Sequence, residues 1–223
     1  VKGKGITGLA IHGDQAWACF SNVVVRLSLD DFTIQEIIEN RDFFDLHGLS
    51  IHNNHLSVAN TGNESVDIIN LATKEFERID LLGDSIRKVR PLLPQGYDTK
   101  PHLHHISSVI IDNDGNLILG FVRQQRILNL SNWEWIGTKK TSPVHDVDCI
   151  NGDIWYTTVG GEIANSKNKW HLSDYQQDIG WTRGLAVTDD GFFVGTTAIR
   201  ESNHDYYKQI TNSETWRTGA KIC

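Results

Sequence analysis

Five copies of one short motif carry the residues of this 223-residue chain that could do chemistry. Each copy is a pair of strand-like apolar runs around a polar turn, and the copy RGLAVTDDGFFVGT begins at Arg183. The first positions of the five copies are Thr7, His47, Ser107, His145 and Arg183. An imidazole exchanges protons near neutral pH, and a guanidinium binds carboxylate or phosphate oxygens through its planar donors. These positions therefore predict acid–base chemistry or the binding of an anion.

A second set of polar residues follows the returning strand of the copies, and His105 stands just before Ser107. In a repeated hairpin these ends lie on the same side as the first positions. We expect His145, His47 and His105 to be the candidate catalytic residues. The candidate ligand-binding residues are Arg183, Arg200, Arg123, Glu201, Asn60, Thr158 and Asn203. The alternative for any single one of them is a structural hydrogen bond to a neighbouring strand.

Histidines also raise the question of a metal. Imidazoles from three copies, His47, His105 and His145, could bind Zn²⁺ or another transition metal, and this is the minority alternative. His102 and His104 are near His105 in the sequence, but in an extended strand they share one face while His105 points to the other. The main expectation is that the protein uses no cofactor and no metal.

The spacing of the copies predicts the elements that position these residues. They start at residues 7, 47, 107, 145 and 183, so the separations are 40, 60, 38 and 38 residues, and further strand-like runs follow each pair. This period is typical of a β-propeller blade. We predict an all-β, five-bladed β-propeller with four antiparallel strands per blade, or alternatively a six-bladed propeller with an incomplete blade. The last blade would be completed by DYYKQI and ETWRTG, at residues 205–210 and 214–219.

We expect residues 1–223 to form a single propeller domain. The expected blades lie near residues 1–40, 41–83, 105–140, 141–177 and 178–223. The wide separation of 60 marks an insertion at residues 84–104, which contains Arg87, Lys88 and Arg90. We expect this loop to lie over the same end of the propeller as the first positions. A surface loop without function is the equally weighted alternative.

Composition excludes several classes of function. The net charge of −7 argues against nucleic acid as a partner, and no apolar run approaches the roughly 20 residues that span a bilayer. The three cysteines are spaced too widely for a disulfide framework or a zinc site, and the first residues lack the pattern of a signal peptide. We therefore expect a cytoplasmic protein without a membrane partner. Motifs for nucleophilic serine, CxxC redox chemistry and phosphate loops are absent from the sequence.

The last blade resembles an uncharacterised bacterial β-propeller family. The family has a C-terminal TRGL…FVG…IRES signature, and the matching residues here are 182–185, 193–195 and 199–202. HGLS at residues 47–50 and PVHDV at 143–147 are similar to earlier blades of that family. The resemblance implies a propeller and draws attention to Arg183, Arg200 and Glu201. It implies no reaction, because the family is a domain of unknown function.

Together these features predict a protein that binds an anionic or polyhydroxylated small molecule in a pocket lined by histidine and arginine. If it is an enzyme, the reaction is of the lyase, isomerase or hydrolase type, with a histidine as general acid or base. The alternative is a non-catalytic interaction scaffold or lectin-like module that uses the same residues, since propellers serve both purposes. The sequence indicates neither the oligomeric state nor the ligand.

Overall fold

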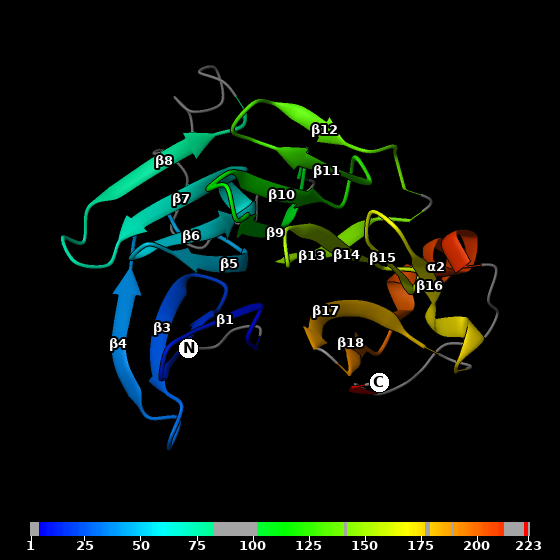
Figure 1. Cartoon of the computed structure of the whole chain (residues 1–223), viewed down its shortest axis with the longest axis horizontal. Coiled ribbons are helices and arrows are strands. Elements are labelled where there is room, and N and C mark those ends of the chain that lie inside the picture. Colours follow the sequence, from blue (N-terminus) through cyan, green and yellow to red (C-terminus); the bar gives the residue numbers. More distant parts are fainter. Residues whose placement is uncertain are drawn as a thin grey trace. The chain divides into compact units, whose positions relative to one another are not determined.

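Antiparallel β-sheets make up most of the structure (Figure 1). The computed structural model describes residues 5–82, 102–140, 142–176, 179–188, 190–211 and 221–222. In each sheet the neighbouring strands follow one another in the chain. Such a meander is the arrangement of a propeller blade. Contacts between Cα atoms divide the chain into two compact units, residues 1–111 and 112–223.

The first unit holds two complete four-stranded sheets. The first sheet consists of β1 (Gly8–His12), β2 (Gln15–Cys19), β3 (Val23–Ser28) and β4 (Ile34–Glu39). The second consists of β5 (Leu46–His52), β6 (His55–Asn60), β7 (Ser65–Asn70) and β8 (Phe76–Asp80), with a short 3-10 helix, η1 (Thr61–Asn63), after β6. Strand β9 (Ile106–Ile111) ends this unit.

The second unit holds the remaining elements. Strands β10 (Leu117–Phe121), β11 (Arg126–Asn129) and β12 (Glu134–Ile136) belong to the sheet that begins with β9. The next sheet consists of β13 (Val144–Ile150), β14 (Asp153–Thr158), β15 (Glu162–Ala164) and β16 (Lys169–His171), and η3 (Leu172–Asp174) follows it. The last sheet has β17 (Trp181–Thr188), β18 (Gly191–Thr197) and β19 (Lys221–Ile222). Between β18 and β19 lie η4 (Glu201–Asn203) and helix α2 (His204–Thr211).

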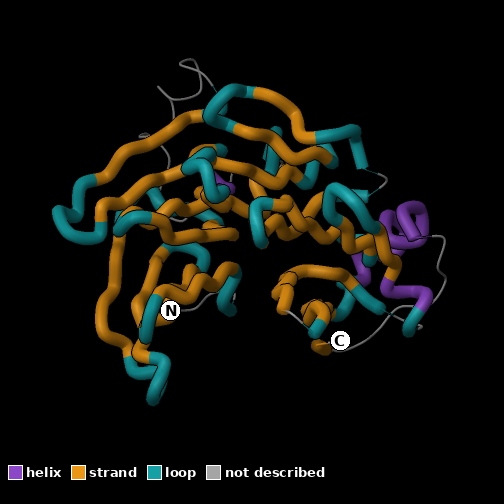
Figure 2. The backbone as a smooth tube through the Cα atoms, in the orientation of Figure 1, coloured by secondary structure: helices purple, strands orange, loops and turns teal. Residues whose placement is uncertain are grey.

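The number of complete blades differs from the prediction. Within the described ranges four sheets have four strands and the last has three, so five four-stranded blades, and equally six blades, are wrong. One cause is visible in the segment DYYKQI, which was expected to be a strand and instead forms most of α2 (Figure 2). Of its two tyrosines, Tyr206 is exposed and Tyr207 is buried. The hydroxyl of Tyr207 donates a hydrogen bond to the carbonyl oxygen of Gly180. Residues 214–219, the second expected strand, lie outside the described part of the chain.

Tight turns join the first two strands of the sheets. Asn53 and Asn54 both have positive φ, and so do Asn151 and Gly152. Two consecutive residues of this kind form the two-residue hairpin turn whose twist matches that of the strands, and Asn and Gly tolerate it best. The turn chemistry read from the sequence is therefore present at these hairpins.

Each unit has its own apolar core. In the first, Trp17, Cys19 and Val24 of one sheet pack with Leu49, Val58 and other residues of the next. In the second, Ile163 and Val194 belong to a cluster beside which the indole rings of Trp155 and Trp170 stack, with centroids 5.6 Å apart. No helix among the described residues is long and apolar enough to cross a membrane.

Two glycines explain the recurring Gly at the second position of the motif. A Cβ on Gly8 would lie 2.1 Å from the carbonyl oxygen of His47, and one on Gly48 would lie 2.6 Å from Cα of Ser108. Real Cβ atoms do not approach backbone so closely, because atoms at these distances overlap. At these two points β1 approaches β5, and β5 approaches β9, too closely for a side chain to fit between them.

Candidate functional site

Irregular strand pairing shapes the start of two strands in the second unit. The register of β13 against β14 shifts between Val144 and Asp146, which leaves His145 as the extra residue. The register of β17 against β18 shifts between Thr182 and Leu185, around Arg183. A β-bulge breaks the regular alternation of a strand and re-aims a side chain, and bulges are common next to active sites.

The two re-aimed side chains meet. Nη1 of Arg183 lies 2.9 Å from Nε2 of His145, and Nε of Arg183 donates a hydrogen bond to the hydroxyl of Thr197 at 3.1 Å. Because a guanidinium only donates, Nε2 of His145 must be the acceptor, so the proton of the neutral ring is on Nδ1. The sequence prediction placed both residues at one site, and the structure brings them into direct contact.

Arg183 has hydrogen-bond partners for its backbone and its side chain, and its surroundings disfavour its positive charge. Its carbonyl oxygen accepts a hydrogen bond from the hydroxyl of Thr157 at 2.9 Å. Burial, and after it the positive charge of Arg200, lower the pKa of the Arg183 guanidinium. A partly buried guanidinium that a second positive charge repels is an environment that a bound anion would stabilise.

Asp146 links the two bulged strands. One oxygen of its carboxyl group, Oδ2, accepts a hydrogen bond from the backbone N–H of Leu185 at 2.8 Å, and Oδ1 accepts one from Val147 at 3.2 Å. Burial raises the pKa of this carboxyl group to about 7, against the lowering effect of the bond from Leu185. Asp146 therefore positions the strand that carries Arg183. From the sequence, Asp146 is a candidate carboxylate next to His145 that could equally cap a loop.

The histidines of the first unit form a separate cluster. His47 lies in the third bulge, where the register of β5 shifts between Leu46 and Leu49, and its Nδ1 is 2.8 Å from the carbonyl oxygen of Asp45. The His47 and His105 rings meet edge to face with centroids 4.9 Å apart. The Nδ1 atoms of His102 and His105 are 2.9 Å apart.

This contact corrects the prediction that His102 and His105 face opposite ways. Residues 102–105 precede β9 as an irregular bend and are not an extended strand. His105 has a φ of 54°, in the left-handed region, which turns its side chain toward His102. The strand alternation assumed from the sequence therefore does not apply to this segment.

A buried carboxylate that sequence reasoning missed holds the bend in place. Glu64 is almost inaccessible to solvent, and its Oε1 accepts hydrogen bonds from the backbone N–H groups of His104, at 3.0 Å, and His105, at 3.5 Å. No signal in the sequence identifies it, because the residue lies 40 positions before its partner and belongs to no motif.

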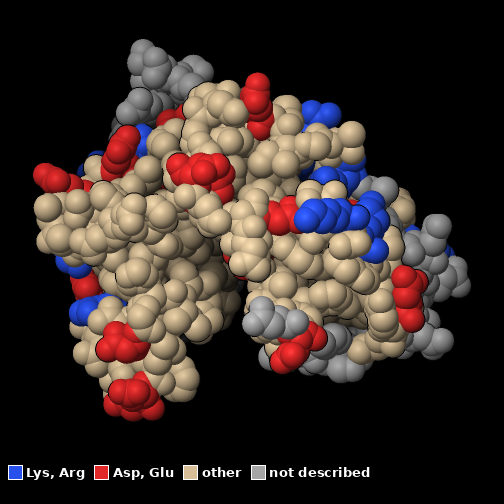
Figure 3. Space-filling view, viewed as in Figure 1, with Lys and Arg blue, Asp and Glu red and all other residues tan. Residues whose placement is uncertain are grey.

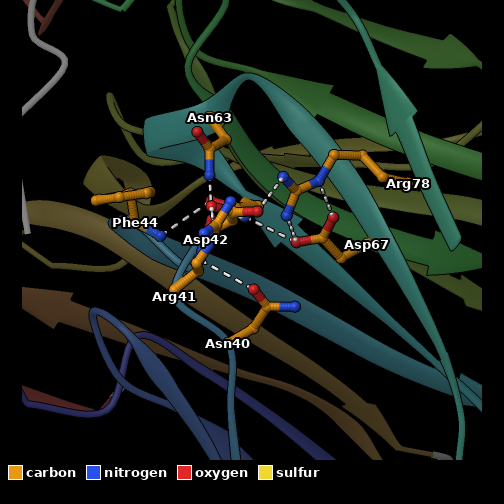
Figure 4. Close-up of polar contacts among 8 residues, drawn as sticks. Asn40, Arg41, Asp42, Phe44, Asn63, Asp67 and Arg78 are labelled. Carbon is orange, nitrogen blue, oxygen red and sulfur yellow. Dashed lines mark hydrogen bonds and ion pairs between the residues drawn. The ribbon is translucent and has the colours of Figure 1, made fainter. Parts of the chain in front are cut away.

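Asn60, a predicted ligand-binding residue, lies inside a polar network of the second sheet. Its Nδ2 donates to the carbonyl of Asp42 and to the Asp67 carboxylate, both at 2.7 Å, and its Oδ1 accepts from the N–H of Phe44 at 3.1 Å. Figure 4 shows the neighbouring contacts, in which the Arg78 guanidinium faces the Asp67 carboxylate. These bonds give Asn60 a structural role in the sheet.

The other predicted ligand-binding residues are scattered over the second unit. Thr158 is fully buried, and its hydroxyl accepts the N–H of Glu162 at 3.2 Å. Arg123, Arg200 and Glu201 are exposed, and the N–H of Asn203 donates to the carbonyl of Arg200 at 2.8 Å. Of this set, Arg200 is the one whose charge acts on Arg183. Residues 84–101 of the predicted loop, including Arg87, Lys88 and Arg90, lie outside the described part of the chain.

Acidic side chains are spread over one face of the molecule. The face shown in Figure 3 carries acidic side chains at several separate places, in a protein of net charge −7. Within the described ranges, no group of three or more His, Cys, Asp or Glu side chains is already arranged to hold a metal ion.

Comparison with known proteins identifies the fold. No family model and no curated protein matches the sequence. Among solved structures, a streptogramin B lyase is 12% identical, with a TM-score of 0.60 over 88% of this chain and 66% of the lyase. A protein of unknown function from Bacteroides caccae is 10% identical, with a TM-score of 0.62 over 87% of this chain and 71% of that one. A β-propeller domain from Myceliophteria thermophila is 14% identical, with a TM-score of 0.56 over 87% of this chain and 66% of that one.

At such identities the similarity shows the fold alone. The chain spans about two thirds of the length of the lyase and of the Myceliophteria thermophila domain. Together with the meandering sheets, these matches confirm the all-β propeller fold that the repeat predicts.

Proposed function

We propose that the protein binds a small molecule with a carboxylate or phosphate group, and that Arg183 and Arg200 provide the positive charge. The observation that carries this proposal is the contact between Arg183 and His145 beside a second guanidinium. Thr197, Thr157 and His145 fix the orientation of the Arg183 side chain and backbone before a ligand arrives. Pre-oriented donors bind more tightly because less side-chain entropy is lost on binding.

The chemistry of the guanidinium favours an anion over a neutral ligand. Nε and Nη1 of Arg183 have protein partners, and no other described residue accepts a hydrogen bond from Nη2. Nη2 is therefore the donor that we expect to bind a ligand oxygen, with Arg200 as the second positive charge. A charge-assisted hydrogen bond of this kind is worth about 1.5–3 kcal/mol.

A reaction on the bound ligand is the second candidate function. The streptogramin B lyase above supports it, because that protein is an enzyme with a similar fold. So does a virginiamycin B lyase from Staphylococcus aureus, whose structure was solved with quinupristin for a catalytically inactive histidine-to-alanine variant. The latter is 16% identical, with a TM-score of 0.57 over 85% of this chain and 62% of that one. In this chain His145 is the candidate base, but its Nε2 accepts from Arg183. It could abstract a proton only after Arg183 moved to the ligand.

Isothermal titration with inorganic phosphate and with citrate tests the binding proposal. Arg183→Gln should weaken binding of at least one of them about 10- to 100-fold, the loss expected for one charge-assisted hydrogen bond. Arg183→Lys should recover only part of it, because the ammonium lacks the planar fork. Arg126→Gln is the matched control, since Arg126 lies against the ring of Trp135 on another strand of the same unit. Equal affinities of Arg183→Gln and the control would favour a non-catalytic scaffold or lectin-like module instead.

A further inference from the structure

We infer that the first unit contains a binding site for one divalent transition-metal ion, formed by the imidazoles of His102, His105 and His47. All of its residues belong to residues 1–111, and none of them is a residue of the proposed anion site. Imidazole nitrogen is a ligand of Zn²⁺, Co²⁺, Ni²⁺ and Cu²⁺, so the class of ion follows from the donor atoms.

The spacing of two nitrogens supports the site. The Nδ1 atoms of His102 and His105 face each other at 2.9 Å. Two nitrogens bound to one tetrahedral zinc, each about 2.0–2.1 Å from it, lie roughly 3.3–3.4 Å apart. The rings would thus separate by only a few tenths of an ångström. Without a metal one of these nitrogens must carry the proton of an N–H···N bond. A bound ion would displace that proton into solvent.

Asp45 orients the ligating nitrogens. Its carbonyl oxygen lies 2.8 Å from Nδ1 of His47, and since a carbonyl only accepts, that nitrogen carries the proton and Nε2 the basic lone pair. The carboxylate Oδ2 of Asp45 lies 4.0 Å from Nε2 of His102, which favours the proton there and the lone pair on Nδ1. A carbonyl or carboxylate behind a ligating histidine is the usual outer arrangement of a metal site, and Asp45 provides one for His47 and, at longer range, one for His102.

The backbone around the cluster is held in disfavoured conformations. Asp45 has a φ of 47°, Glu64 of 52° and His105 of 54°, although none of them is glycine. Such residues cost about 1–3 kcal/mol each and concentrate at functional sites. Glu64 accepts hydrogen bonds from the backbone N–H groups of residues 104 and 105. These bonds offset part of the conformational cost and bring the His105 ring to His102.

His47 is the side chain that must move. Its ring stands edge-on to His105 at a centroid distance of 4.9 Å, and the three rings do not yet surround one point. For Nε2 of His47 to bind the same ion, the ring would have to rotate about its side-chain bonds until Nε2 faces the two Nδ1 atoms. The site is therefore assembled by the ion from side chains that already lie together.

Cobalt absorption spectroscopy and zinc calorimetry on the full chain test the inference. The wild type should bind one equivalent of Co²⁺ with the visible bands of a nitrogen-ligated ion, and Zn²⁺ should displace it. His102→Ala and His105→Asn should each weaken binding at least 10-fold, the loss typical of a disturbed metal site. Asn tolerates the positive φ of residue 105, so His105→Asn keeps the test valid if His102→Ala does not fold.

The matched control is the double variant His52→Ala/His55→Ala, which removes the two histidines that flank the β5–β6 turn, one half-buried and one exposed. It should bind Co²⁺ as the wild type does. Arg183→Gln should also leave metal binding unchanged, which separates this inference from the proposed anion site. Absence of stoichiometric Co²⁺ binding by the wild type, or binding that survives both His102→Ala and His105→Asn, would overturn the metal site.

Discussion

Nη1 of Arg183 and Nε2 of His145 lie 2.9 Å apart, although the two residues are 38 positions apart in the chain. Each occupies a bulge at the start of a strand, so the same irregularity brings both side chains out of the sheet alternation. The contact makes the imidazole an acceptor and the guanidinium its donor. His145 is thus first a positioning residue for Arg183.

Replacing His145 tests whether its main role is to position Arg183. His145→Ala removes the acceptor, so Arg183 gains freedom and phosphate or citrate binding should weaken about 3- to 10-fold, in line with one ordinary hydrogen bond. His145→Asn retains a side-chain acceptor and should lose less. The measurement is isothermal titration, with His171→Ala on the exposed strand β16 as the control. Unchanged affinity in His145→Ala, together with lost turnover, would instead assign His145 to proton transfer alone.

Asp146 should make stability depend on pH. The folded protein keeps a proton on this carboxyl group up to about pH 7, whereas the unfolded chain loses it near its ordinary pKa of 3.8. The folded state therefore binds more protons between these values, and the free energy of unfolding falls as pH rises through that interval.

Asp146→Asn should remove this fall, because an amide oxygen still accepts the N–H of Leu185 and has no charge to bury. At pH 8 the variant should be more stable than the wild type by about 1–3 kcal/mol, while at pH 4 the two should be similar. Urea unfolding at several pH values gives the comparison. Asp114→Asn, in an exposed turn, is the control. Parallel pH profiles of wild type and Asp146→Asn would contradict the assignment.

Gly48→Ala should destabilise the first unit. The new Cβ would lie 2.6 Å from Cα of Ser108 and 2.9 Å from N of Val109, and backbone cannot yield as a flexible side chain can. We expect a loss of about 1–3 kcal/mol in the free energy of unfolding, measured with urea. Gly184→Ala is the control at the equivalent motif position, because its Cβ would meet nothing closer than Oδ2 of Asp146 at 4.0 Å. Equal stability of the two variants would refute the close strand approach.

Arg78→Met should strongly lower the free energy of unfolding. Its guanidinium holds the buried Asp67 carboxylate at 2.5 and 2.9 Å, and removal leaves that charge unpaired. A loss of about 2–4 kcal/mol is expected from thermal or urea unfolding, since breaking a buried pair leaves an uncompensated ion. Arg41→Met removes a much more exposed arginine from the same network and should change stability by about 0.5 kcal/mol or less. Similar losses in both variants would argue against the pairing with Asp67.

Some features were readable from the sequence because they depend on local chemistry. Paired Asn and Gly residues marked hairpin turns, and period-two apolar runs marked strands on both sides of them. The repeat spacing then predicted a propeller. The prediction was wrong for the last sheet, where α2 replaces an expected strand. Tyr207 of this helix is buried by a contact with Gly180, a residue far away in the chain. Local strand propensity was overridden there by tertiary packing.

For the candidate sites, the sequence by itself determined which residue types stand at the first position of each hairpin: His47, His145 and Arg183 were all found in this way. Only the tertiary structure decided what the side chains of those residues contact. Bulges in β5, β13 and β17 re-aim the side chains, the left-handed φ of His105 turns its ring to His102, and Glu64 and Asp146 hold the strands that carry them. A register shift and a buried hydrogen bond depend on partners distant in sequence, so no local pattern records them.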